Sequence, residues 1–173
     1  GLSCDAARYR LTDVIGREAR RFSFLQDSGK LTEADKSIYR AMTALQDGQY
    51  AMNQPLLESA LKTLSELLCK HYGQKVIILI DEYDVPLDKA YQHGYYREMV
   101  ALIRAVLGDV LKTNDFLQFA VLTGCLRVSK ESIFTGLNNF KVLSITDARF
   151  DEQFGFTEKE VQELLRTYHL EAH

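Results

Sequence analysis

The sequence lacks the features that are typical of membrane proteins, of secreted proteins and of proteins stabilised by a bound metal. No apolar run reaches the roughly 18 residues of a membrane-spanning helix, and the N-terminus has no basic region followed by an apolar one. The three cysteines, Cys4, Cys69 and Cys125, are far apart and form no Cys-x-x-Cys pair, so they indicate neither a disulfide framework nor a zinc knuckle. A net charge of -3 provides no bulk attraction to nucleic acid or to a membrane surface. We therefore expect a cytoplasmic protein with reduced thiols.

The length of the chain limits the number of domains. With 173 residues and 46% hydrophobic content, it can form one ordinary core but not two large ones. We expect one domain or part of one. The first residue is Gly1 rather than Met, which suggests a piece of a longer protein.

Helical periodicity of apolar residues covers much of the chain. Thr32 with Asp35, and Thr157 with Glu160, resemble capping boxes, and Pro55 occupies the first turn of another helix. A polar, tyrosine-rich turn is expected after Pro86. The predicted helices run from Asp5 to about Leu25, from Thr32 towards Leu45 (ended by Asp47-Gly48), from Asn53 to Gly73, from about Tyr95 to Lys112, and onward from Thr157.

Basic residues at the end of the first predicted helix have two interpretations. Arg20 and Arg21 could contact an anionic ligand, or they could form part of a solvated helix face. The solvated helix face is the favoured interpretation.

Nearly all-apolar strands alternate with these helices. The predicted strands lie at about 76–80, 116–122 and 140–145. Such strands are typical of parallel sheets buried on both faces, so we predict a three-layer α/β fold with a parallel sheet. Three strands are few for a doubly wound sheet, which indicates that further strands are missing.

An acidic cluster follows the first of these strands. Asp81, Glu82 and Asp84 come directly after Val76–Ile80, where ligands bind in open α/β sheets. An aliphatic strand that ends in Asp-Glu is the Walker B pattern, in which the Asp orients magnesium and the Glu polarises the attacking water. Acidic residues at strand ends also serve as helix caps or turn formers, so the pattern by itself leaves both interpretations open.

Three longer motifs resemble those of the bacterial AAA-ATPase-like family, P-loop proteins often found with a nuclease-like domain further along the chain. They are Ile-Leu-Ile-Asp-Glu-Tyr-Asp-Val-Pro-Leu at 78–87, Leu-Thr-Gly-Cys-Leu-Arg-Val-Ser-Lys-Glu-Ser-Ile-Phe-Thr-Gly-Leu-Asn-Asn-Phe at 122–140, and Phe-Gly-Phe-Thr-Glu-Lys-Glu-Val at 154–161. The three fall in the order in which the family has them. The resemblance implies a P-loop NTPase domain that uses ATP and magnesium.

The resemblance also implies roles for particular residues. Asp81 corresponds to the Walker B magnesium residue and Glu82 to the catalytic glutamate. Thr123 occupies the place of the polar sensor that contacts the γ-phosphate or the attacking water. Arg127 could bind a phosphate with its planar fork of donors, or it could form a salt bridge to Asp84 or Glu131. Asp84 is interpreted as a turn and network residue.

One element of the family pattern is absent. A P-loop requires Gly-x-x-x-x-Gly-Lys followed by Ser or Thr, whereas the only Gly-Lys pair, Gly29-Lys30, is followed by Leu31 and preceded five positions earlier by Phe24. The resemblance implies that this Walker A loop and the first two strands lie upstream of Gly1.

The chain would then be the C-terminal part of one P-loop domain. We expect a helical segment at 1–74, a Walker B and sensor core at 75–150, and the start of a following helical region at 151–173. The 173 residues alone are expected to neither bind ATP tightly nor hydrolyse it.

Two functions of other classes remain as alternatives. The chain could be a non-catalytic helical interaction module that binds a protein partner. It could also be a metal-dependent nuclease that uses Asp81, Glu82 and Asp84, although the sequence contains no (Asp/Glu)-x-Lys triplet of the restriction type. Contact with nucleic acid is expected only through a domain outside this segment.

Overall fold

The structure is a computed structural model that describes residues 3–112, 114–125, 141–144, 149 and 155–170. It divides into two units, Gly1–Leu137 and Asn138–His173, which we describe separately.

The first helix begins where a side chain can cap it. Helix α1 (Cys4–Arg20) follows Ser3, whose hydroxyl accepts the Ala6 amide at 3.2 Å. The cap satisfies one of the amides that a helix start leaves without a partner.

The prediction that this helix continues to about Leu25 is wrong. Helix α1 ends at Arg20, and a 3-10 helix, η1 (Ser23–Asp27), follows after Phe22 leaves the helical backbone region. The change from 3.6 to about 3 residues per turn alters which side chains face inward. Leu25 is fully buried in this arrangement.

Both predicted starts of the next two helices are confirmed. Helix α2 (Glu33–Thr43) has a complete capping box, in which Thr32 and Asp35 exchange hydrogen bonds. Helix α3 (Gln54–Tyr72) begins after Asn53, whose side chain accepts the Leu56 amide at 3.0 Å. It ends at Gly73, which has the left-handed backbone conformation expected of a glycine cap, with φ 70°.

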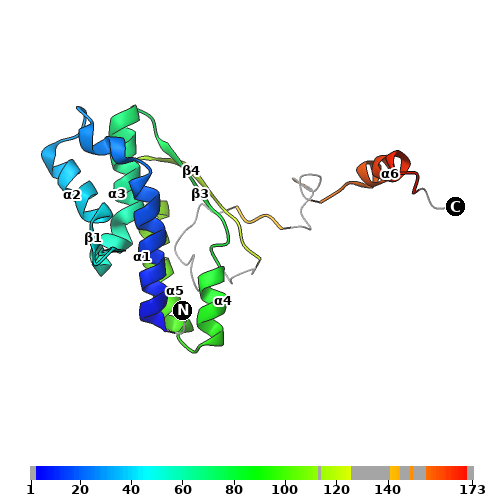
Figure 1. Ribbon diagram of the computed structural model, residues 1–173, viewed down its shortest axis with the longest axis horizontal. Helices are drawn as coiled ribbons and strands as arrows, with labels where there is room; N and C mark the ends of the chain where they lie inside the picture. The colour runs from blue at the N-terminus through cyan, green and yellow to red at the C-terminus, as the bar shows by residue number, and fades with distance from the viewer. Residues whose placement is uncertain (1–2, 113, 126–140, 145–148, 150–154, 171–173) are drawn as a thin grey trace. The chain divides into compact units, whose positions relative to one another are not determined.

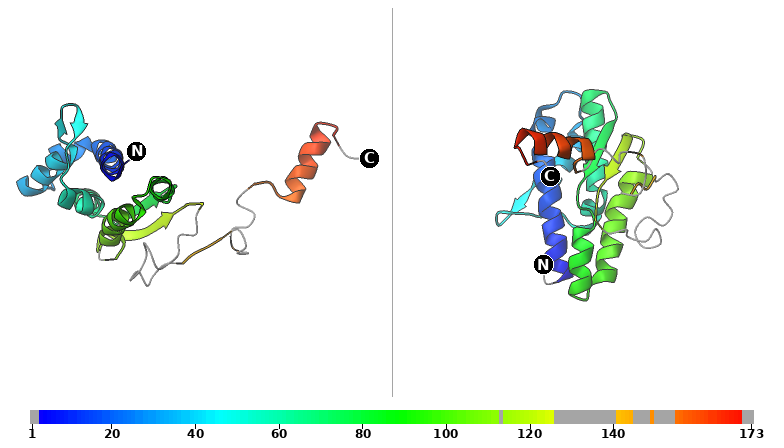
Figure 2. Two further views of the ribbon diagram at one scale, coloured as in Figure 1. Left: turned by 90° about the horizontal axis from the view of Figure 1, so that it is seen from below. Right: turned by 90° about the vertical axis from the view of Figure 1, so that its right-hand side faces the viewer.

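A short hairpin between α2 and α3 was not predicted. Strands β1 (Leu45–Gln46) and β2 (Gln49–Tyr50) pair antiparallel around Asp47-Gly48, where both residues have positive φ, 52° and 78°. This is the geometry of a two-residue hairpin turn, for which Asp-Gly is a strong signal. Figure 2 shows the hairpin projecting from the helices. From the sequence, Asp47-Gly48 was predicted only to end a helix.

The segment after Pro86 is helical, so the predicted polar turn is wrong. Helix α4 (Val85–Gln92) holds Pro86 in its first turn, where a missing amide hydrogen removes no intrahelical bond. The chain turns at Gly94, with φ 80°, before α5 (Tyr96–Lys112). Helix α5 packs against α3 and α4, and Figure 1 shows α1, α3 and α5 side by side. Their facing side chains form the core.

Two of the three predicted strands pair in parallel, as expected. Strand β3 (Val76–Ile80) lies beside β4 (Leu117–Leu122), with Ile80 opposite Leu122 at their carboxyl ends. The third prediction, at 140–145, is wrong for residues 141–144, which form no strand, while 140 and 145 lie outside the described residues. A strand requires a hydrogen-bonding partner. None of the described residues of the unit Asn138–His173 is in a strand that could pair with 141–144.

The described helices cover one face of the parallel pair. Ile80 and Leu122 pack against the core formed with α3 and α5. The opposite face carries exposed apolar side chains, so the expectation of strands buried on both faces is wrong for the part of the chain that the structure describes. We call this surface the outer sheet face; it consists of Ile77, Leu79, Phe119 and Val121, with exposed fractions of 53%, 75%, 49% and 46%.

The unit Asn138–His173 contains one described helix, α6 (Glu158–Thr167). Its predicted capping box is confirmed, because the Thr157 amide and hydroxyl both donate to Glu160 Oε2 at 2.8 Å. Those bonds lower the pKa of the Glu160 carboxyl. The fold as described is a mixed α/β arrangement with a parallel strand pair.

Candidate functional site

The carboxyl ends of β3 and β4 bring together residues far apart in sequence. The Thr123 amide donates to the Ile80 carbonyl at 2.9 Å, and the Tyr83 amide donates to the Thr123 carbonyl at 3.1 Å. These two bonds continue the ladder past the last strand residues. They place Asp81 and Thr123 next to each other at one end of the sheet.

The side chains of these two residues are in direct contact. The Thr123 hydroxyl donates to Asp81 Oδ1, and both residues are exposed to solvent. The contact links positions 42 residues apart. We call Asp81, Glu82 and Thr123 the strand-end site. An accessible carboxylate held by a hydroxyl can bind a hard cation or a hydrogen-bond donor.

Glu82 has a strained backbone. Its φ is 52°, in the left-handed region that residues other than glycine rarely adopt. Such strain costs on the order of 1 to 3 kcal/mol and persists only where the surroundings enforce it. Here the Val85 amide donates to the Glu82 carbonyl at 3.1 Å and so closes the turn into α4. The Glu82 side chain is exposed to solvent, and Asp81 is the preceding residue in the sequence.

Asp84 differs from Asp81 and Glu82 because it is buried, with only 3% of its surface exposed. Its backbone carbonyl accepts the Leu87 and Asp88 amides as α4 begins. Burial, and secondarily the charge of Asp84, raise the pKa of the neighbouring Tyr83 hydroxyl. The interpretation of Asp84 as a turn residue agrees with this position.

Arg127 lies outside the described residues, so its predicted phosphate contact and its alternative salt bridges stay predictions. Among the described residues, no group of three or more His, Cys, Asp or Glu side chains could hold a metal ion. A metal at the strand-end site would therefore rely on one or two carboxylates and on ligands other than protein. Magnesium accepts such a ligand set, since it keeps several waters and takes few carboxylates.

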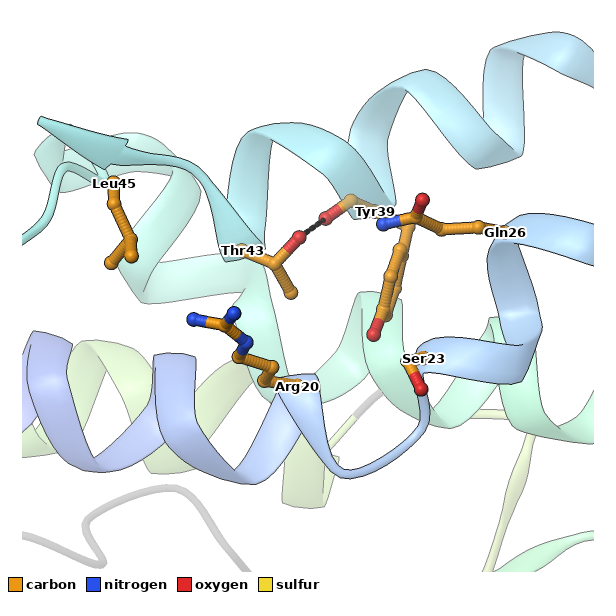
Figure 3. A pocket seen from close by; sticks show the side chains of 6 residues that line it. All are labelled: Arg20, Ser23, Gln26, Tyr39, Thr43 and Leu45. Atoms are coloured by element: carbon orange, nitrogen blue, oxygen red, sulfur yellow. Dashed lines mark hydrogen bonds between the residues drawn. The ribbon is translucent and has the colours of Figure 1, made fainter.

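A separate hollow of about 380 Å³ lies at the end of α1. Figure 3 shows its lining, with a hydrogen bond of 3.0 Å from the Thr43 hydroxyl to the Tyr39 carbonyl. Arg20 lines the hollow, whereas Arg21 pairs with Glu18 at 2.8 Å on the helix surface. The hollow contains no acidic side chain that could orient a metal. Its lining residues are Arg20, Ser23, Gln26, Tyr39, Thr43 and Leu45.

Gly124 is a residue of this region for which the sequence predicted no role. A Cβ atom there would lie 2.7 Å from Asp84 Oδ1 and 2.9 Å from Tyr83 Cε1, closer than real Cβ atoms approach other groups. A glycine near the end of a strand can mark a place where another group approaches the backbone closely. That signal was present in the Thr123-Gly124 pair.

Comparisons with known proteins agree with the motifs. A family model described as "Predicted AAA-ATPase" matches residues 5–134, which include α1 to α5, the parallel strand pair and the strand-end site. The chain belongs to this predicted AAA-ATPase family. The expected family resemblance is thus confirmed. The matched range includes the motif at 78–87 and residues 122–134 of the second motif, whereas residues 135–140 and the motif at 154–161 lie beyond it.

The chain is also similar to a curated protein. An uncharacterized protein in the vnfD 5' region of Azotobacter chroococcum mcd 1 is 36% identical over 90 residues, which are 51% of this chain but 17% of the relative. The chain therefore spans a small part of that relative's length. No solved structure matches the chain. No described helix is both long enough and apolar enough to cross a bilayer.

Proposed function

We propose that this chain supplies the Walker B and sensor part of an ATPase. Asp81 orients magnesium through water, Glu82 polarises the attacking water, and Thr123 contacts the γ-phosphate or that water. The observation that carries the proposal is the hydrogen bond from the Thr123 hydroxyl to Asp81 at the carboxyl ends of two parallel strands. Family membership over residues 5–134 supports it.

The residues present fit magnesium. Asp81 offers an exposed carboxylate whose Oδ1 accepts the Thr123 hydroxyl, and this carboxylate would hold the ion through a bound water. When bound with ATP, magnesium would neutralise charge on the β- and γ-phosphate oxygens. Glu82 is one residue further along the chain, and its left-handed backbone directs the chain away from the strand into α4. The backbone conformation of Glu82 thus differs from that of Asp81. This difference fits the different roles proposed for the two carboxylates.

The phosphate-binding loop is proposed to come from outside the 173 residues. Gly29-Lys30 does not serve as one, because Lys30 Nζ donates to the His71 carbonyl at 2.6 Å in the turn between η1 and α2. No other Gly-Lys pair is present. The intact protein, not this segment alone, is therefore proposed to bind and hydrolyse ATP.

The test is Glu82→Gln in the full-length protein. Removing a general base typically costs about 10² to 10⁴ in rate, so we expect turnover to fall at least about 100-fold while ATP binding is retained. Glu98→Gln, an exposed glutamate in the first turn of α5, is the matched control and should leave turnover unchanged. Unchanged turnover in Glu82→Gln would refute the assignment of the base.

A non-catalytic interaction module is the second candidate, favoured by the exposed apolar outer sheet face. Partner binding by the full-length protein distinguishes the two. A dependence of partner affinity on ATP supports a nucleotide-driven switch. An affinity indifferent to nucleotide supports the module.

A further inference from the structure

Asp84 is a buried carboxylate that the proposed mechanism does not use. Burial of a carboxylate is costly unless its environment compensates for lost hydration, and 3% of Asp84 is exposed. It lies two residues after Glu82 in the sequence, and its Oδ1 is close to the position of Gly124, the residue after Thr123. A structural contribution specific to this site would explain why a charge is kept there.

Helix capping does not explain the side chain. Asp84 precedes α4, but its backbone is helical, with φ -91° and ψ -15°, and its side chain makes no capping hydrogen bond to the described first turn. By contrast, Thr32, Asn53 and Thr157 are extended, and their side chains do cap helices. The carboxylate of Asp84 is instead directed to the end of β4.

Gly124 is the group that Asp84 approaches. A Cβ at this position would lie 2.7 Å from Asp84 Oδ1 and 2.9 Å from its Cγ. The backbone of Gly124 is not in the left-handed region, so the site requires glycine for space rather than for conformation. At Gly29 and Gly108, no described atom would lie within 4 Å of a Cβ.

We propose that Asp84 and Gly124 are positioning residues that hold Thr123 against Asp81. Gly124 follows Thr123, and Tyr83, which also contacts the Gly124 position, donates its amide to the Thr123 carbonyl at 3.1 Å. A side chain at 124 would push the end of β4 away from the β3–α4 turn. The Thr123 hydroxyl would then lose its contact with Asp81.

This inference deepens the proposed function and rests on it for its effect on catalysis, but the geometric part can be tested separately. The experiment uses the full-length protein and measures hydrogen exchange of the Tyr83 and Thr123 amides together with ATP turnover. For Gly124→Ala, we expect exchange at both amides to rise at least about tenfold, and kcat to fall at least about tenfold with KM for ATP changed less than about twofold. Gly108→Ala is the matched control and should change neither readout.

A double-mutant cycle keeps the test decisive if Gly124→Ala disturbs folding. Asp84→Ala removes Oδ1 and Cγ, two of the atoms that an alanine at 124 would meet, and leaves Tyr83 Cε1 in place. Gly124→Ala should therefore accelerate amide exchange less in the Asp84→Ala background than in the wild type, without losing its effect entirely. Additive effects, or exchange rates unchanged in Gly124→Ala, would overturn the positioning role. If the wild-type protein hydrolyses no ATP, the proposed function fails, and the exchange measurements still decide whether Asp84 and Gly124 hold the strand ends.

Discussion

The helical part of the chain and the parallel strand pair differ in how much of their apolar surface is buried. In α2 and α3, the helix starts are capped and the apolar side chains face one another. In β3 and β4, one face is packed and the other exposes four large apolar side chains. The strand pair also carries the strained Glu82 and the buried Asp84. The difference teaches that the strands carry more apolar surface than the described helices cover.

The largest expected difference between the two regions is the cost of removing a leucine. Leu57 of α3 is fully buried, so Leu57→Ala should lower the free energy of unfolding by about 2 to 5 kcal/mol. Leu79 on the outer sheet face is 75% exposed, so Leu79→Ala should change it by less than about 0.5 kcal/mol. Urea denaturation of the 173-residue chain measures both. A cost above about 2 kcal/mol for Leu79→Ala would be typical of a covered site, and would remove the contrast between the regions.

A second prediction tests how closely the helical region is packed. A Cβ at Gly16 of α1 would lie 2.4 Å from Tyr50 Cδ1, on the β1–β2 hairpin. Overpacking costs about 1 to 3 kcal/mol, and alanine regains roughly 0.5 to 1 kcal/mol of helix propensity. We expect Gly16→Ala to destabilise by about 1 to 2 kcal/mol, measured as a shift of the urea midpoint. Gly108→Ala, in α5 without a neighbour among the described atoms, should be neutral or stabilising.

The smallest expected effect concerns the charge that the helical region buries. Lys70 Nζ contacts Asp35 Oδ1 at 2.8 Å and, with the Thr32 amide, holds the pKa of Asp35 below its ordinary value of 3.8. A lowered carboxyl pKa stabilises the fold above the ordinary value, and that stability is lost as the pH falls through the lowered pKa. Asp35→Asn should cost about 1 kcal/mol at pH 7, and the difference from wild type should shrink in acid.

Urea midpoints at pH 7 and in acid, below the lowered pKa of Asp35, measure this effect. Asp88→Asn is the matched control, since Asp88 also lies in the first turn of a helix but is exposed. Asp88→Asn should shift the urea midpoint at pH 7 much less than Asp35→Asn does, because Asp88 is exposed. A difference between Asp35→Asn and wild type that persists in acid would mean that the ion pair with Lys70 is not its source.

Local signals made the helical region predictable. The capping residues Thr32, Asn53 and Thr157 marked helix starts correctly because each needs only a hydrogen bond three residues away. The errors came where two signals competed. Asp47-Gly48 was treated as a helix end rather than a hairpin turn, and Pro86 as a break rather than a first-turn residue.

The candidate site was predictable to a smaller extent. The rule that ligands bind beyond the carboxyl ends of parallel strands was enough to expect the acidic cluster with Asp81 at that edge, whereas the place of Thr123 was implied by the family resemblance. The backbone strain of Glu82 and the approach of Asp84 to Gly124 were not predictable, because they depend on how the β3–α4 turn meets the end of β4. The strand predicted at 140–145 was wrong for residues 141–144 for the same reason, because a strand forms only with a hydrogen-bonding partner.

The amino-acid sequence by itself determined where most helices start, that the strands near 76–80 and 116–122 are parallel, and which acidic residues stand at a strand end. These features depend on hydrogen bonds within a few residues and on the spacing of apolar side chains. Only the tertiary structure decided that Thr123 contacts Asp81, that Asp84 is buried against Gly124, and that one face of the strand pair is exposed. Contacts between segments about 40 residues apart depend on how those segments pack, and no local pattern encodes that distance.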